Sequence, residues 1–137
     1  MHIIATVLLG PGSESIVADA IASVRGQVDE FLLIESGGGN AAIDVAIAAV
    51  DGPHCVLPFC WLGDYGAARQ FALEQARMLG FDYALTLDPD ERMELGPEFR
   101  ARLEAYPSVD VWILSDRDTG YFKERVIRTD TRAHWHG

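Results

Sequence analysis

Two carboxylates, Asp88 and Asp90, follow an apolar run that is typical of a buried strand, residues 83–87. Successive side chains of a strand point to opposite faces, so residues two apart are expected to face the same way. Such a pair can supply oxygen ligands to a divalent cation that also contacts phosphate. Pro89 stiffens the link between them. The alternative is an ordinary surface turn, because Asp and Pro are both common turn residues.

The elements that must position these carboxylates alternate between strand and helix. The apolar pattern predicts strands at residues 3–9, 31–34, 54–57, 83–87, 109–114 and 122–128. It predicts helices at 13–25, 41–50, 64–79 and 97–105, with a turn at 116–120. Ser13 is expected to cap the first helix and Asp64 the third. We therefore predict one α/β domain over residues 1–137, with a mostly parallel sheet and helices on both faces.

In such a sheet, ligands bind outside the carboxyl ends of the strands. Unusual residues gather there: Leu9-Gly10-Pro11-Gly12 ends the first strand, Glu35 follows the second, and the Asp pair follows the fourth. A dinucleotide fingerprint is disfavoured, since its third glycine would fall at Ser15. A phosphatase of the haloacid dehalogenase type is disfavoured by Arg92, where that family has Thr or Val.

The charge and composition of the chain disfavour several classes of binding partner. The formal net charge is −10 and the pI is about 4.6, which argues against nucleic acid or an anionic membrane surface as partner. No run approaches the length needed to span a bilayer. Two cysteines do not make a disulfide framework, so a reducing cytoplasm is expected. Four cations within one short segment could receive a phosphate or balance nearby acids: Lys123, Arg125, Arg128 and Arg132.

Three stretches resemble the nucleotide-sugar-dependent glycosyltransferases of the A-type fold, specifically family 2. Residues 28–37, 64–70 and 84–91 are similar to the family's "gvDEivVvDsGS", "DFgaaRN" and "vlflDaDE" segments, in the family's order and spacing. Residues 122–128 and 134–137 are a weaker match to "ykeRlfR" and "wxG". The resemblance covers nearly the whole chain but extends only to the family's nucleotide-binding core.

The resemblance implies a role for each matching residue. Glu35 takes the place of the Asp that reads the uracil or ribose, and Arg69 that of an Arg on the base or phosphate. Asp88 would contact ribose and metal, and Asp90 would bind Mn²⁺ or Mg²⁺ bridging the two phosphates. Further candidates are Leu9, Gly10, Pro11 and Asp64 for the nucleotide, Lys123, Arg125 and His134 for the diphosphate, and His136 for the diphosphate or the metal. Glu91, Trp61 and Trp112 are expected to be structural.

The resemblance leaves catalysis open. An inverting transferase needs a carboxylate base that takes the proton of the acceptor hydroxyl. Asp116 and Asp118 are the only local candidates for this base, and the sequence does not identify the catalytic residue. The first hypothesis is a metal-dependent transferase that uses a UDP-sugar and an unknown acceptor. The second is a non-catalytic UDP-binding module, and the third a structural acidic domain. Apolar surface that longer relatives cover would favour self-association, as in a homodimer.

Overall fold

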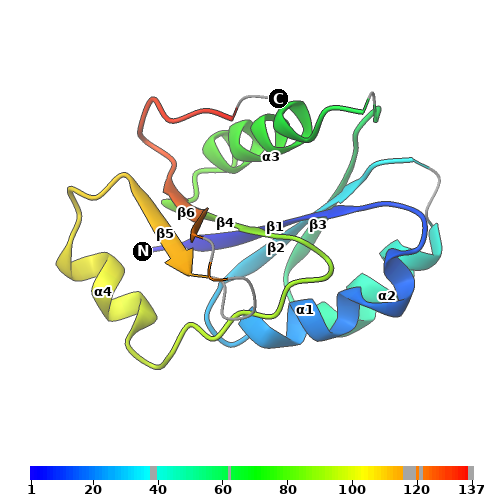
Figure 1. Cartoon of the computed structure of the whole chain (residues 1–137), viewed down its shortest axis with the longest axis horizontal. Coiled ribbons are helices and arrows are strands. Elements are labelled where there is room, and N and C mark those ends of the chain that lie inside the picture. Colours follow the sequence, from blue (N-terminus) through cyan, green and yellow to red (C-terminus); the bar gives the residue numbers. More distant parts are fainter. Residues whose placement is uncertain (38–39, 62, 116–119, 121, 136–137) are drawn as a thin grey trace.

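A six-stranded sheet forms the centre of the molecule in the computed structural model, which describes residues 1–37, 40–61, 63–115, 120 and 122–135 (Figure 1). The strands are β1 (Ile3–Leu9), β2 (Glu30–Glu35), β3 (His54–Pro58), β4 (Tyr83–Leu87), β5 (Val111–Ser115) and β6 (Phe122–Arg128). The helices are α1 (Val17–Val24), α2 (Asn40–Val50), α3 (Tyr65–Met78) and α4 (Phe99–Ala105), with a 3₁₀ turn at Ser13–Ser15. Strand and helix alternate as the sequence predicts.

The strand order is β3-β2-β1-β4-β6-β5. The first four strands are parallel, whereas β6 runs antiparallel to both β4 and β5. Leu9 pairs with Glu35, and Val7 pairs with Leu87, so β1, β2 and β4 end at the same edge of the sheet. The prediction of a mostly parallel α/β sheet is confirmed. The shared edge brings the segments that follow these three strands together.

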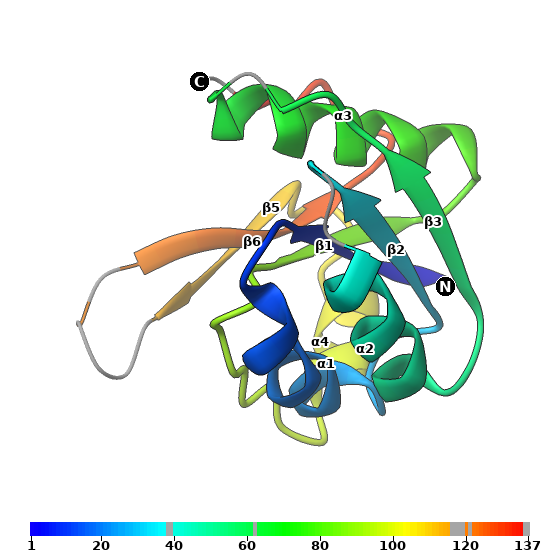
Figure 2. The same cartoon turned by 90° about the vertical axis from the view of Figure 1, so that its right-hand side faces the viewer.

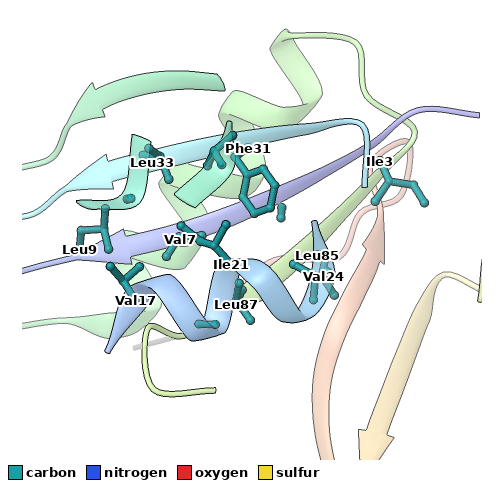
Figure 3. Packing of buried hydrophobic residues seen from close by; sticks show 14 of the residues in the cluster. Ile3, Val7, Leu9, Val17, Ile21, Val24, Phe31, Leu33, Leu85 and Leu87 are labelled. Carbon is teal, nitrogen blue, oxygen red and sulfur yellow. The ribbon is translucent and has the colours of Figure 1, made fainter. Parts of the chain in front are cut away.

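Helices cover both faces of the sheet, as predicted (Figures 1 and 2). On one face, α1, α2 and α4 pack on a core that includes Val7, Leu33 and Leu85, all fully buried (Figure 3). On the other face, α3 packs through Ala72, Leu73 and Ala76 against alternate residues of the same strands. The strands are thus buried on both sides, which explains why they read as continuous apolar runs rather than alternating ones.

The first helix differs from its prediction. The chain turns at Gly12, whose φ of 91° is in the left-handed region, forms one 3₁₀ turn, and starts α1 only at Val17. The Ser13 hydroxyl accepts a hydrogen bond from the Gly10 amide at 3.3 Å, so it closes the turn and does not cap a helix. A single helix over residues 13–25 was therefore wrong, because local turn chemistry at Gly10–Ser13 competes with helix initiation.

The start of α3 agrees with its prediction. Asp64 has extended backbone angles, and its Oδ1 accepts from the Ala67 amide at 3.0 Å. This is the usual N-cap geometry, and it fixes where the cleft-facing side of α3 begins. Gly80, at φ 81°, follows the helix end, as predicted.

The remaining helices and strands agree with their predicted positions, apart from small differences at their ends. The helix predicted at 97–105 spans Phe99–Ala105, and the strand predicted at 109–114 spans Val111–Ser115. Residues 116–119 of the predicted turn lie outside the described residues. Within the described part of the chain, no helix has the length and apolar character required to cross a bilayer.

Candidate functional site

A cleft of about 570 Å³ opens at the carboxyl ends of β1, β2 and β4. It is lined by Leu8, Gly10, Pro11, Ser13, Ile16, Ser36, Trp61, Tyr65, Arg69, Asp88, Pro89 and Asp90. Five of these are residues that the sequence analysis placed in the nucleotide or metal site: Gly10, Pro11, Arg69, Asp88 and Asp90. Segments that are far apart in the sequence therefore meet in one hollow, at the edge where ligands of parallel sheets bind.

The two aspartates lie on a turn. Strand β4 ends at Leu87, and the Glu91 amide donates to the Asp88 carbonyl at 3.0 Å, which closes a four-residue turn over Asp88–Glu91. The Glu91 carboxylate reaches back to accept from the Asp88 amide at 2.8 Å. The two carboxylates were expected to face the same way as on a continuing strand, whereas they lie on a turn, the alternative that the sequence analysis gave. Both nevertheless line the cleft, Asp88 partly buried and Asp90 exposed.

Arg125 lies beneath this turn. Its side chain is 6% exposed, and its Nη2 lies 3.1 Å from Glu91 Oε2 and 3.3 Å from Asp88 Oδ2. Its Nε also donates to Glu91 Oε2, at 3.2 Å. Lys123 Nζ approaches the same Glu91 oxygen at 3.7 Å. Arg125 therefore holds the turn from below and does not line the cleft, which differs from its predicted contact with the diphosphate.

Arg69 is the cation at the cleft surface. Its side chain is 24% exposed, and its Nη2 donates to both oxygens of Asp88 at 3.1 Å. Its guanidinium carbon lies 5.2 Å from the centre of the Trp135 ring and 6.0 Å from that of Tyr65. Two aromatic rings and one carboxylate thus fix its position. Two other acids near Arg69 in the sequence have other partners: Asp64 accepts from the Ala67 amide and Glu74 from Gln70, both at 3.0 Å.

The first strand reaches the cleft through its backbone. Leu9 is fully buried beside Val17 (Figure 3), and its carbonyl accepts from both the amide and the hydroxyl of Ser36, at 2.9 and 2.8 Å. Its side chain and its carbonyl are therefore both engaged within the fold, and the contact of Leu9 with a nucleotide stays a prediction. At Gly10 an added Cβ would lie 3.4 Å from Ser36 Oγ, which is an ordinary van der Waals contact.

Three other predicted nucleotide or phosphate residues lie near the cleft without lining it. Glu35 ends β2 and is partly buried, one residue before Ser36, which does line the cleft. Asp64 is used as the N-cap of α3. The His134 ring nitrogen Nδ1 lies 3.2 Å from the Arg132 carbonyl. His136, the predicted phosphate or metal ligand, lies outside the described residues, as do Asp116 and Asp118.

The sequence analysis missed an aromatic part of the cleft. Trp61 was expected in the core, but it is 37% exposed and lines the cleft with Tyr65, which is 63% exposed. Trp112, by contrast, packs on the core as expected. The four-residue spacing of Tyr65 and Arg69 was the available signal for Tyr65, because residues at that spacing share a helix face. Trp61 precedes α3, so this signal does not extend to it.

The oxygen atoms that the cleft offers are of the kind that a hard cation such as Mg²⁺ prefers. Asp88 and Asp90 offer carboxylate oxygens, and Mg²⁺ sites commonly combine one or two carboxylates with substrate phosphates. Among the residues that the structure describes, no group of three or more His, Cys, Asp or Glu side chains is arranged to hold a metal ion. The residues present therefore fit a metal only when a bound phosphate completes its coordination.

The fold of this chain is similar to the folds of several solved structures. No family model matches the chain, and no curated protein matches it in sequence. Among solved structures, the 1–349 fragment of TarS from S. aureus superposes with a TM-score of 0.72 at 15% identity, covering 94% of this chain. A candidate nucleotide-diphospho-sugar transferase from Desulfovibrio desulfuricans G20 gives 0.56 at 16% identity and 95% coverage. A 4-diphosphocytidyl-2C-methyl-D-erythritol synthase from Anaerococcus prevotii gives 0.53 at 13% identity and 93% coverage.

The aligned region is a part of each of these proteins. It amounts to 47% of the TarS fragment, 65% of the Desulfovibrio protein and 70% of the synthase. At these identities the likeness concerns architecture, and it extends over nearly all of this chain. The chain therefore has the fold of these structures, and its cleft opens at the carboxyl edge of the parallel strands.

Proposed function

We propose that this chain binds UDP or a UDP-sugar in the cleft and acts in metal-dependent sugar transfer. One observation carries the proposal: Gly10, Pro11, Arg69, Asp88 and Asp90, which come from three separate segments, line a single cleft. Two of the similar structures are named as a nucleotide-diphospho-sugar transferase and a diphosphocytidyl synthase, and both names refer to nucleotides with linked phosphates. The shared chemistry is a nucleoside diphosphate group.

The charges of the cleft suit a diphosphate, even though the chain is acidic as a whole. Arg69 presents a partly exposed guanidinium at the cleft surface, and a planar guanidinium matches phosphate oxygens in pairs. Arg125 supports Asp88 and Glu91 from below, and so fixes the turn that carries Asp90. In this proposal Arg69 and Asp90 contact the ligand, whereas Arg125 is a positioning residue.

In the transfer reaction the acceptor hydroxyl attacks the anomeric carbon, the bond from that carbon to the diphosphate breaks, and UDP departs. Mn²⁺ or Mg²⁺ held by Asp90 and Asp88 would neutralise charge on the departing diphosphate. Arg69 would stabilise the same charge from the α3 side of the cleft. The acceptor proton requires a base, for which no described residue of the cleft other than the two aspartates is a candidate.

The second candidate function is a UDP-binding module without transferase activity. The aspartates are committed to the ligand in the proposed site, and Asp116 and Asp118 lie outside the described residues. The chain also spans about half of the TarS fragment that it resembles. Binding without turnover is therefore a distinct hypothesis, in which the acceptor and the base are supplied elsewhere.

Binding is tested by calorimetric titration of UDP with and without Mn²⁺, on the wild type and on Asp90→Ala. We expect metal-dependent binding that weakens at least about tenfold in the variant, a loss of about 1.4 kcal/mol. Glu104→Ala is the matched control, because Glu104 is an exposed acid on α4, on the other face of the sheet from α3. Parallel titrations with CDP and GDP identify the preferred base. The proposal is contradicted if Asp90→Ala and Glu104→Ala lower the affinity for UDP equally, or if the wild type does not bind UDP.

Turnover separates the two candidate functions. Release of UDP from UDP-glucose or UDP-N-acetylglucosamine, with Mn²⁺ and a panel of sugar acceptors, supports the transferase. Tight UDP binding with no release from either donor supports the binding module. Asp90→Ala serves as the negative control in each assay, since residual release in that variant would come from another activity in the preparation.

A further inference from the structure

Two exposed aromatic side chains line the cleft and have no role in the function proposed above. Trp61 is 37% exposed and Tyr65 is 63% exposed, although both are large rings that folding usually buries. Their ring centres lie 4.8 Å apart with an interplanar angle of 66°, an edge-to-face contact. Gly63, at φ 81°, lies in the loop that brings Trp61 back against the first residue of α3.

These rings are connected to the charged part of the cleft. Tyr65 begins α3, and Arg69 follows one helical turn later, with its guanidinium carbon 6.0 Å from the Tyr65 ring centre. Arg69 in turn contacts Asp88 at 3.1 Å. The cleft therefore passes from aromatic surface to cation to carboxylate. Pro11 and Ile16, the latter 43% exposed, add apolar surface to the same hollow.

A nucleotide has the same order of chemical groups, with a flat aromatic base, a ribose and a charged diphosphate. If the diphosphate lies at Arg69 and Asp90, the base extends either toward Trp61 and Tyr65 or toward Pro11, Ser13 and Ser36 in the rest of the cleft, where no aromatic ring of a described residue lines it. Stacking on an aromatic ring is favourable for every base, because each has a π-face. The aromatic end of the cleft is therefore the favoured position for the base.

From this arrangement we infer that Trp61 and Tyr65 bind the nucleobase and supply the part of the affinity that depends on the base. The inference rests on the proposed function, since it requires a nucleotide in this cleft. It adds two ligand-contacting residues from the β3–α3 segment. It also requires that the two rings contribute no direct contact to the affinity for a ligand that lacks a base.

The test compares two ligands that share the diphosphate. Affinities for UDP and for inorganic pyrophosphate are measured by calorimetry with Mn²⁺, for the wild type, Trp61→Ala and Tyr65→Ala. We expect each alanine variant to bind UDP at least about tenfold more weakly, within the range for removal of one ring from a base stack. Pyrophosphate affinity should stay within twofold in Trp61→Ala, and should fall by no more than about two- to fivefold in Tyr65→Ala, which also removes an exposed cation–π contact of Arg69. Tyr65→Phe keeps the ring and should retain most of the UDP affinity.

Two controls complete the design. Tyr106→Ala removes an aromatic residue that is 57% exposed next to α4, and it should change neither affinity. In the wild type, UDP should quench tryptophan fluorescence, and Trp61→Phe should reduce that quenching, since Trp112 and Trp135 do not line the cleft.

The outcomes separate this inference from the proposed function. UDP binding that depends on Asp90 but not on either ring overturns the inference and leaves the function standing. An equal loss of UDP and pyrophosphate affinity overturns it as well, because the rings would then act through Arg69. Absence of UDP binding by the wild type overturns both. Selective loss of UDP affinity in the two alanine variants supports both.

Discussion

The guanidinium of Arg125 is shared by two carboxylates beneath the Asp88–Glu91 turn, and its side chain is 6% exposed. A buried cation of this kind compensates charges that would otherwise be poorly solvated. Glu91, 16% exposed, accepts hydrogen bonds from Arg125 and from the Asp88 amide, and its Oε2 lies 3.7 Å from Lys123 Nζ. The position of Asp90 in the cleft thus depends on residues that do not line the cleft.

Replacing Arg125 by Met should lower the free energy of unfolding by about 2–4 kcal/mol, because two partly buried carboxylates lose their shared partner. Lys123→Met is the matched control on the same strand, with a side chain 36% exposed and 3.7 Å from Glu91. It should cost less than about 1 kcal/mol. Urea denaturation followed by circular dichroism measures both. Similar decreases in the two variants would mean that Arg125 does not hold the turn.

Among the secondary-structure elements, α3 holds the segment that follows β6. Arg77 donates to three carbonyls of this segment, those of Thr129, Thr131 and Ala133, at 2.8, 3.0 and 2.5 Å. Gln70 accepts from the Trp135 amide at 2.7 Å. Figure 1 shows this segment rising from β6 to the level of α3. The segment therefore brings Trp135 over Arg69 from a distant part of the sequence.

Arg77→Gln should release this segment, because a single amide cannot reach three carbonyls. We expect faster trypsin cleavage after Arg132, which is exposed within the segment. We also expect UDP affinity to fall about two- to fivefold, the effect of removing one exposed cation–π interaction from Arg69. Arg102→Gln, on α4, removes an arginine from an exposed pair with Glu98 and is the control. Unchanged cleavage after Arg132 would show that other interactions hold the segment.

For the molecule as a whole, Asp29 links the start of the chain to α4. Its Oδ2 accepts from the Ile3 amide at 2.8 Å and from Arg100 at 3.2 Å. Burial by itself would raise the pKa of Asp29, but the Ile3 hydrogen bond and Arg100 outweigh it, so the pKa lies below its ordinary value of 3.8. A lowered pKa stabilises the folded state above the unfolded-state pKa, and this stabilisation is lost as pH falls through the folded-state pKa.

Asp29→Asn should therefore remove part of the pH dependence of stability. The difference in unfolding free energy between wild type and Asp29→Asn should be constant at pH 6–7 and should shrink as pH falls below about 4. Urea denaturation at a series of pH values measures it. Asp19→Asn removes an exposed acid 3.8 Å from Arg92 and should give a nearly constant difference. If the difference in unfolding free energy between wild type and Asp29→Asn were the same at every pH, the lowered pKa of Asp29 would be contradicted.

The predicted homodimer stays a prediction, which sedimentation equilibrium can check. Ile113 and Phe122 are 55% and 74% exposed on the β5–β6 hairpin. They lie on the same face of it, because Ser115 pairs with Phe122 and Ile113 with Glu124.

Local sequence was sufficient to predict the elements and their order, because strand and helix periods are local properties of the chain. The apolar runs of β1, β2 and β4 and the alternation with helices were enough to place Gly10, Asp88 and Asp90 at one edge, whereas Arg69 was assigned to the site by the family resemblance. Which side chains face the cleft depended on long-range packing. Lys123 and Arg125 are both basic and both approach Glu91, yet the Lys123 side chain is 36% exposed and that of Arg125, which also pairs with Asp88, is 6% exposed. Likewise, Trp61 is apolar in sequence, and its exposure depends on how the β3–α3 loop packs, which no local pattern encodes.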